Sequence, residues 1–155
     1  MRQINRIKDG LVNQKKSISF TFNGHILTGY EGDTLASALL ANNKKLVGRS
    51  FKYHRPRGIV TAGSEEPNAI MEIGNGPYKD PNTRATITEL YDGLEANSQN
   101  HKGPLGFDLM AIIDFLSPLV GAGFYYKTFM WPKAFWEKFY EPAIRNAAGL
   151  GTLST

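Results

Sequence analysis

A predicted two-residue turn constrains the fold of this chain more than any other feature of its sequence. Asn23 and Gly24 both tolerate positive φ angles, and they stand between two extended patterns at residues 17–22 and 26–28. In the first pattern apolar side chains alternate with Ser and Thr, as on a strand with one buried face. We therefore predict a β-hairpin that is closed by a type I′ turn.

A helix and further strands are expected to follow this hairpin. Asp33 can cap the helix, and apolar residues recur at helical spacing until Asn42 and Asn43. The segments with the composition of short strands are residues 46–47, 59–60, 69–73 and 85–90. A hairpin, a helix and strands in this order are typical of a β-grasp domain, so we predict an α+β fold in which this domain spans residues 16–96.

The two ends of the chain are expected to lie outside this domain. Residues 1–15 are polar and predict an extended arm, whereas residues 97–155 carry long apolar segments that predict helices. Pro118 should interrupt the first helix, and Pro132 can open a second one that Pro142 should kink. Because the aromatic side chains of this extension exceed what a small sheet can cover, we predict that it docks onto another chain or domain. The residues expected to dock are Phe129, Trp131, Phe135, Trp136, Phe139 and Tyr140.

Composition narrows the class of protein. A chain of 155 residues, 41% of them hydrophobic, suits one globular domain with an appendage. It has no run of about 18 apolar residues that could span a membrane, and its first residues do not have the pattern of a secretory signal. The absence of cysteine excludes disulfides and is compatible with the cytoplasm, which is the expected location.

The loop between residues 56 and 73 has the layout of a plant-type ferredoxin cluster loop, but it contains no cysteine. Thr61, Glu66 and Ala69 hold the spacing C-x₄-C-x₂-C. A [2Fe–2S] cluster needs four thiolates, or two thiolates with two imidazoles, and the chain offers no Cys and 3 scattered His. We therefore interpret these three residues as vacated cluster positions and predict no metal site.

A basic stretch is the other feature of the central sequence. Residues 34–64 contain no Asp or Glu, and their cations are Lys44, Lys45, Arg49, Lys52, Arg55 and Arg57. Such a stretch favours phosphates, carboxylates or an acidic protein surface, and the aromatic residues within it would also suit single-stranded nucleic acid. A net charge of +4 is low for a nucleic-acid binder, so we favour an internal docking surface. Contacts with a flavin or nicotinamide phosphate, or with an interface, are a further interpretation for Arg49, Lys52, Arg55 and Arg57.

No catalytic constellation is present in the sequence. His54 has no neighbour in sequence that suits acid–base chemistry, so we predict that it makes a structural hydrogen bond. A nucleophile, a base and an orienting group do not occur together, and a G-x-G-x-x-G loop for a dinucleotide is absent. We therefore predict that this segment carries no catalytic residues.

Several stretches closely resemble the amino-terminal region of the α subunit of heterotetrameric sarcosine oxidase. They are residues 32–42, 47–58, 63–69, 89–94 and 123–132. Relatives in the same superfamily, such as hydrogen cyanide synthase and amine dehydrogenase subunits, are similar but keep cysteines at the cluster spacing. The resemblance therefore supports the interpretation of Thr61, Glu66 and Ala69 as vacated positions in a ferredoxin-like domain without its cluster.

The resemblance implies an oxidoreductase that demethylates sarcosine to glycine, transfers the methylene group to tetrahydrofolate and passes electrons through flavins to oxygen. It implies FAD and FMN at the β subunit and its interface, and NAD and tetrahydrofolate on the rest of the α subunit. None of these cofactors is expected on this chain alone. The implied partners are the remainder of the α subunit and the β, γ and δ subunits.

Two hypotheses about function follow from these observations. In the first, the chain is a non-catalytic structural and docking domain of a sarcosine-oxidase-like flavoenzyme complex. In the second, it is a free-standing basic binding module for nucleic acid or another polyanion. The first hypothesis accounts for both the resemblance and the aromatic helices, and it requires no nucleic acid and no membrane.

Overall fold

The computed structural model describes residues 3–8, 10–115 and 133–147 of the chain. The strands are β1 (Asn13–Phe22), β2 (His25–Glu31), β3 (Gly48–Arg49), β4 (Pro56–Arg57), β5 (Ile70–Ile73), β6 (Asp80–Arg84) and β7 (Glu95–Ser98). The helices are α1 (Leu35–Ala41), α2 (Ile112–Phe115) and α4 (Glu141–Ala147). Shorter or irregular helical turns are η1 (Gly76–Tyr78), η2 (Leu109–Ala111), η3 (Lys133–Phe135) and the π-helical η4 (Trp136–Tyr140).

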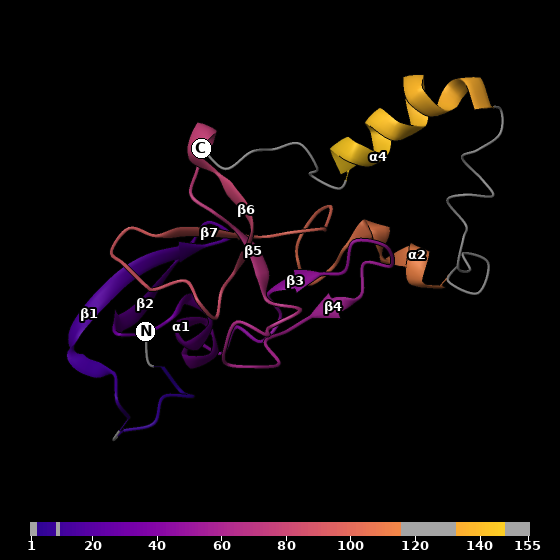
Figure 1. The fold of residues 1–155 in the computed structure, drawn as a ribbon. Helices are drawn as coiled ribbons and strands as arrows, with labels where there is room; N and C mark the ends of the chain where they lie inside the picture. The colour runs from indigo at the N-terminus through magenta and orange to yellow at the C-terminus, as the bar shows by residue number, and fades with distance from the viewer. Residues whose placement is uncertain (1–2, 9, 116–132, 148–155) are drawn as a thin grey trace.

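The main sheet has five strands in the order β2-β1-β7-β5-β6 (Figure 1). Strand β1 pairs antiparallel with β2 and parallel with β7, whereas β5 is antiparallel to both β7 and β6. A hairpin, a helix and a second strand pair that returns beside the first strand define a β-grasp domain. The predicted α+β, ferredoxin-like fold is therefore confirmed, and β3 and β4 add a separate two-stranded sheet.

The predicted hairpin is present, and its turn has the expected geometry. Asn23 has φ 49° and Gly24 has φ 77°, which are the two consecutive positive angles that a type I′ turn needs. Phe22 pairs with His25 across this turn. The alternation of β1 then places Phe20 and Phe22 on the buried face of the sheet.

Helix α1 is present, but the residue that caps it differs from the prediction. Thr34 is the N-cap, and it forms a capping box in which its side chain accepts from the Ser37 amide and the Ser37 hydroxyl accepts from the Thr34 amide. Asp33 does not cap the helix because its carboxylate accepts instead from Tyr30, Ser37 and Arg6. The helix ends at Ala41, before Asn43 with φ 60°, as expected.

The strand prediction for residues 69–73 is confirmed by β5, but residues 59–60 are not a strand. The backbone amides of Val60 and Thr61 donate to the Glu66 carboxylate and are therefore unavailable to a ladder. The preceding residues form the short pair instead, because β4 lies at Pro56–Arg57 and β3 begins one residue after the predicted 46–47.

The predicted strand at residues 85–90 is also wrong. The carbonyls of Ala85 and Thr88 accept from the first amides of α1, at Ala36 and Leu35. This segment therefore satisfies the amino terminus of the helix instead of extending the sheet. Strand β6 ends at Arg84, and β7, whose residues are mostly polar, was not predicted.

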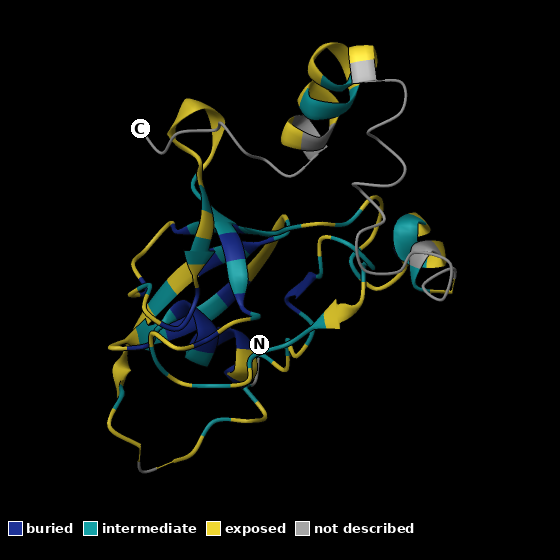
Figure 2. Ribbon diagram, turned by 45° about the vertical axis from the view of Figure 1, so that its right-hand side comes forward, coloured by how far each residue is buried: buried dark blue, intermediate teal, exposed yellow. Residues whose placement is uncertain are grey.

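The core lies between α1 and the sheet. Figure 2 shows the buried residues gathered on this helix and on the strands that it faces. The largest fully buried apolar side chains are Phe20, Leu35, Leu39, Met71, Leu94 and Val47. Each would lose roughly 1.5–3 kcal/mol of burial free energy if it were exposed, so this cluster supplies most of the packing of the domain.

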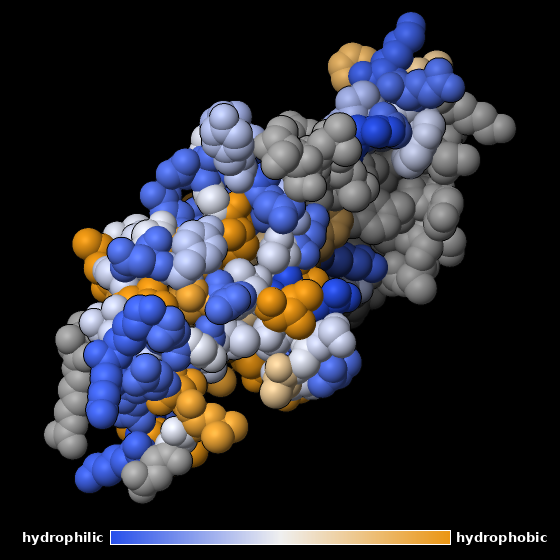
Figure 3. Space-filling model, turned by 60° about the vertical axis from the view of Figure 1, so that its left-hand side comes forward, coloured by the Kyte–Doolittle hydropathy of each residue, from blue (hydrophilic) through white to orange (hydrophobic). Residues whose placement is uncertain are grey.

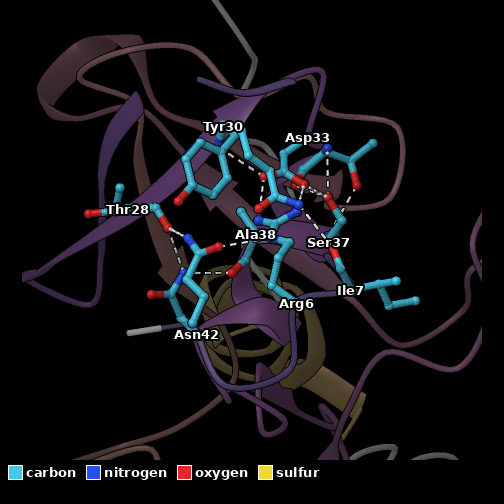
Figure 4. A network of polar contacts seen from close by, with 11 residues as sticks. Arg6, Ile7, Thr28, Tyr30, Asp33, Ser37, Ala38 and Asn42 are labelled. Atoms are coloured by element: carbon cyan, nitrogen blue, oxygen red, sulfur yellow. Dashed lines mark hydrogen bonds and ion pairs between the residues drawn. The ribbon is translucent and has the colours of Figure 1, made fainter. Parts of the chain in front are cut away.

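The amino-terminal residues are bound to the domain through an arginine (Figure 4). Arg6 Nη1 and Nη2 donate to the two oxygens of Asp33 at 2.7 and 2.6 Å, and its guanidinium lies 5.2 Å from the Tyr30 ring centroid. Burial opposes ionisation of Asp33, but the hydrogen bonds from Arg6, Ser37 and the Tyr30 amide hold the pKa of this carboxyl below its ordinary value. Asn42 ties the helix to β2 beside this network, since its amide donates to the Thr28 carbonyl at 2.8 Å.

The carboxy-terminal part is described from Lys133 to Ala147, and its turns lie outside the five-stranded sheet (Figure 1). The π-helical turn η4 changes to α-helix at Glu141, next to Pro142, which stands near the start of α4 where its missing amide is tolerated. The predicted break at Pro118 and the predicted docking residues Phe129 and Trp131 lie outside the described residues. Within those described, every helix is too short or too polar to cross a membrane.

The Arg6–Asp33 pair predicts a measurable effect of the amino-terminal arm on stability. Arg6→Ala leaves the Asp33 carboxylate, whose side chain is 0% exposed, without its charged partner. We expect a loss of about 3 kcal/mol in the free energy of unfolding, because a buried charge then lacks compensation. Urea unfolding monitored by circular dichroism measures this loss.

Lys8→Ala is the matched control, because it removes one positive charge from an exposed residue of the same arm. This variant should change the free energy of unfolding by less than about 0.5 kcal/mol. Equal effects of the two substitutions would show that the arm does not bind Asp33 in solution.

Candidate functional site

The three residues interpreted as vacated cluster positions meet around one buried carboxylate. Glu66 is 0% exposed, and its Oε2 accepts from the amides of Val60 and Thr61 at 2.8 and 2.6 Å. Its Oε1 accepts from the amides of Asn68 and Ala69 at 2.8 and 3.1 Å. The Thr61 hydroxyl adds a fifth, longer bond to Oε2 at 3.2 Å. The structure thus brings together Thr61, Glu66 and Ala69, which the sequence pattern had grouped.

Three further contacts hold this loop against the rest of the domain. The buried Thr86 donates its hydroxyl to the carbonyl of Gly63 at 2.7 Å, and Ala85 donates its amide to the carbonyl of Ala69. On the other side, Arg57 Nη1 donates to the Asn68 side chain at 2.6 Å. The loop is therefore fixed from both flanks as well as from within.

The environment of Glu66 favours its charged form. Burial alone would disfavour a carboxylate, but the hydrogen bonds from the amides of Thr61, Asn68, Val60 and Ala69 outweigh it and lower the pKa of Glu66 to about 2. Within the described part of the chain, Glu66 forms no ion pair. Backbone dipoles therefore stabilise its charge, as in an anion-binding nest.

This set of side chains does not fit an iron–sulfur cluster. The chain contains no cysteine, and among the described residues no group of three or more His, Cys, Asp and Glu could hold a metal ion. The side chains of Thr61 and Ala69 cannot supply thiolates, and both oxygens of Glu66 are already acceptors of amide hydrogen bonds.

Arg49 of the basic stretch points inward. Its side chain is 7% exposed and donates to the carbonyls of Leu105, His54 and Gly106. These contacts connect β3 to the segment that follows β7. The N–H groups of its guanidinium already donate to backbone carbonyls, so a phosphate contact by Arg49 would require the loss of these bonds.

Asp108 is a second buried carboxylate and joins the same two segments. It accepts from His54 Nδ1 at 2.6 Å and from the amides of Lys102 and Met110 at 3.0 Å. Burial opposes its ionisation, but the two amides and His54 hold the pKa of Asp108 below its ordinary value. His54 thus makes a hydrogen bond to a residue that sequence reasoning did not identify, because 54 positions separate the two.

The remaining cations of the basic stretch lie nearer the surface. Lys52 Nζ and Arg55 Cζ lie 4.8 and 4.7 Å from the centroid of the Tyr53 ring, which is within reach of cation–π attraction. Arg55 Nε also donates to Asp114 at 2.6 Å, although both side chains are about half exposed. Such an exposed pair contributes little to stability.

Exposed apolar side chains gather in the segment after residue 106. They are Phe107, Leu109, Ile112, Phe115, Phe135 and Phe139. Phe135 and Phe139 pack edge to face with ring centroids 5.5 Å apart, while Trp136 and Tyr140 are half-buried. On the face drawn in Figure 3, by contrast, apolar groups form separate patches among hydrophilic ones.

The fold and the loop define a ferredoxin-like domain whose cluster positions lack thiolates. Residues 15–101 match the family described as "2Fe-2S iron-sulfur cluster binding domain", and the chain belongs to this family. Its relatives include "Sarcosine oxidase subunit alpha" from Rhizobium meliloti (strain 1021), 64% identical over 147 residues, which are 95% of this chain and 15% of that subunit.

A subunit of the same name from Corynebacterium sp. (strain U-96) is 39% identical over 97 residues, or 61% of this chain and 10% of that subunit. The chain thus spans a small part of the length of these relatives. Among solved structures, the crystal structure of L-proline dehydrogenase from P. horikoshii aligns with a TM-score of 0.49 and 28% identity. That alignment covers 64% of this chain and 18% of that one.

The absence of thiolates predicts the outcome of cluster reconstitution. The purified chain should stay colourless after anaerobic treatment with iron and sulfide, because residues 61, 66 and 69 offer no sulfur ligand. Cysteine at these three positions should also fail, since a cluster needs a fourth ligand. Visible charge-transfer bands with stoichiometric iron in the wild type would contradict the prediction.

The lowered pKa of Glu66 predicts how stability depends on pH. The group titrates at about 2 in the folded chain and near 4.5 when unfolded. Its contribution is therefore complete above pH 4.5 and is lost as the pH falls through 2. Glu66→Gln should cost about 3 kcal/mol at neutral pH, and the difference from wild type should shrink between pH 4.5 and 2.

Urea unfolding at a series of pH values measures this difference. Glu65→Gln is the control, because Glu65 is exposed and adjacent and loses the same charge. A constant difference between wild type and Glu66→Gln down to pH 2 would mean that the carboxylate contributes no charge-dependent stability.

Proposed function

We propose that this chain is a non-catalytic structural and docking domain of a sarcosine-oxidase-like flavoenzyme complex. The observation that carries the proposal is the 64% identity over 95% of the chain with a much longer sarcosine oxidase subunit. A segment this similar, yet only 15% of that subunit's length, suits one module of a larger assembly.

Two features of the chain support a structural role over a catalytic one. The positions that would bind an electron-carrying cluster lack thiolates, and the sequence has no glycine-rich loop for a nucleotide phosphate. In addition, the partly buried His54 lies 2.6 Å from the buried Asp108, which also accepts from the backbone amide of Lys102, so this pair serves the fold. We therefore assign the chemistry to other parts of the complex.

The proposed docking surface is formed by the exposed apolar side chains of the extension. Phe107 and Phe115 are 73% and 83% exposed, and Phe139 is 61% exposed. Contiguous exposed apolar groups mark interaction sites, and Phe135 and Phe139 form such a pair with ring centroids 5.5 Å apart. The partners would be the remainder of an α subunit and the β, γ and δ subunits, which would hold FAD, FMN, NAD and tetrahydrofolate.

In this proposal the whole complex oxidises sarcosine to glycine in the cytoplasm and transfers the methylene group to tetrahydrofolate. The Arg55–Asp114 pair, which is about half exposed, offers charges that could be exchanged at the interface. The alternative function, a polyanion-binding module, has less support because Arg49 and Arg57 already donate to groups of the fold.

Substitutions on η4 test the docking role. Trp136→Ala and Phe139→Ala should each weaken assembly of the chain with the other subunits by about 2 kcal/mol or more if they are anchors. The melting temperature of the β-grasp domain should change much less, because neither side chain belongs to its core. Titration calorimetry with the co-purified remaining subunits measures the first effect, and thermal unfolding measures the second.

Glu137→Ala with Lys138→Ala is the matched control, because both residues are exposed on the same turn. The isolated wild-type chain should also bind a hydrophobic dye and self-associate, and partner binding should suppress both. Unfolding of the isolated chain by the aromatic double substitution, with a monomeric wild type that binds no dye, would refute the docking role. Tight salt-dependent binding of single-stranded DNA would favour the alternative.

A further inference from the structure

A loop that is shaped to bind an iron–sulfur cluster has amides that need an acceptor, and this need remains when the thiolate ligands are lost. The sulfur atoms of iron–sulfur clusters accept hydrogen bonds from the surrounding protein, and these bonds tune the cluster. A loop shaped to supply such donors would bury several unpaired amides if the anion were simply removed. Each buried amide without an acceptor costs roughly 1–3 kcal/mol, so an empty loop of this shape would be unstable.

In this chain the donors of the loop converge on one side chain. Four amides and one hydroxyl reach the Glu66 carboxylate, two amides at each oxygen. Within the described residues, the one buried side-chain polar atom without a hydrogen-bond partner is Gln99 Oε1, which lies outside this loop. The Glu66 carboxylate is therefore the shared acceptor of these five donors.

The position of this carboxylate in the sequence is equally informative. Glu66 is itself the middle residue of the vacated spacing, and two of its donors are the amides of Thr61 and Ala69, the other two positions. The carboxylate therefore lies between the places where thiolates would stand in a cluster-bearing relative. It also carries a negative charge without a cation as partner among the residues described.

We propose that the Glu66 carboxylate is a built-in anion that replaces the iron–sulfur cluster as the acceptor around which this loop folds. The loop keeps the amide nest of its family but fills it with its own side chain. The domain consequently folds without iron or sulfide and serves as a scaffold that carries no electrons through a cluster. This inference concerns the loop alone and is independent of which complex the chain joins.

Matched variants of the full chain test the proposal. Glu66→Met keeps a side chain of similar length but replaces both carboxylate oxygens by a weakly accepting thioether, and Glu66→Gln replaces one acceptor oxygen by a donor. Both should lower the folding equilibrium constant at least tenfold, whereas Glu65→Gln should change it less than threefold. Urea unfolding gives these constants, and the wild type should unfold identically with and without a metal chelator.

Hydrogen exchange provides a readout that loss of packing alone would not move. In the wild type the amides of Val60, Thr61, Asn68 and Ala69 should exchange at least tenfold more slowly than that of the exposed Glu65. In Glu66→Gln they should exchange at least tenfold faster than in wild type, beyond any change common to the amides of β1 and β2. This measurement on the wild type remains decisive if the variants do not fold.

Three results would overturn the proposal. One is a Glu66→Met variant as stable as Glu65→Gln, because the carboxylate would then be dispensable. Another is fast exchange of the four amides in the wild type, because no anion would then hold them. The last is destabilisation of the wild type by a chelator, because the loop would then depend on a metal.

Discussion

Buried carboxylates that accept backbone amides hold the irregular parts of this structure in place. Asp33 joins the amino-terminal arm to helix α1, Glu66 organises the loop before β5, and Asp108 joins the segment after β7 to β3 and β4. All three are nearly inaccessible to water, yet each has a pKa below its ordinary value. Hydrogen bonds from fixed donors therefore outweigh the cost of burying the charges.

These carboxylates hold connecting segments that the small apolar core of this fold cannot hold. Five strands and a helix of seven residues bury a small apolar cluster, while long connecting segments have many polar backbone groups and few apolar side chains. Such segments cannot be held by hydrophobic burial alone. A carboxylate is an effective acceptor here, because a single side chain pairs several amides at once and its charge strengthens each bond.

Some regular elements followed from local patterns, whereas β6, β7 and the contacts of the loops did not. The Asn23-Gly24 turn, the end of α1 and β5 depend on the conformational preferences of a few adjacent residues, so the sequence predicted them. The segments at 59–60 and 85–90 have strand-like composition, but Glu66 and the first turn of α1 take their backbone groups. The spacing grouped Thr61, Glu66 and Ala69, which lie together in the structure, whereas the role of Glu66 as acceptor depends on a loop conformation that spacing does not encode. His54 and Asp108 lie too far apart in sequence for either to predict the other.

A cluster would give such a loop two things, an anion for its amides and covalent connections through its ligands, and this chain supplies each by a different means. The Glu66 carboxylate provides the anion. The connections are replaced by ordinary hydrogen bonds, from the Thr86 hydroxyl to the Gly63 carbonyl on one flank and from Arg57 to Asn68 on the other. Because polar side chains of the chain itself supply both the anion and the connections, the β-grasp scaffold can keep this loop in place without thiolates.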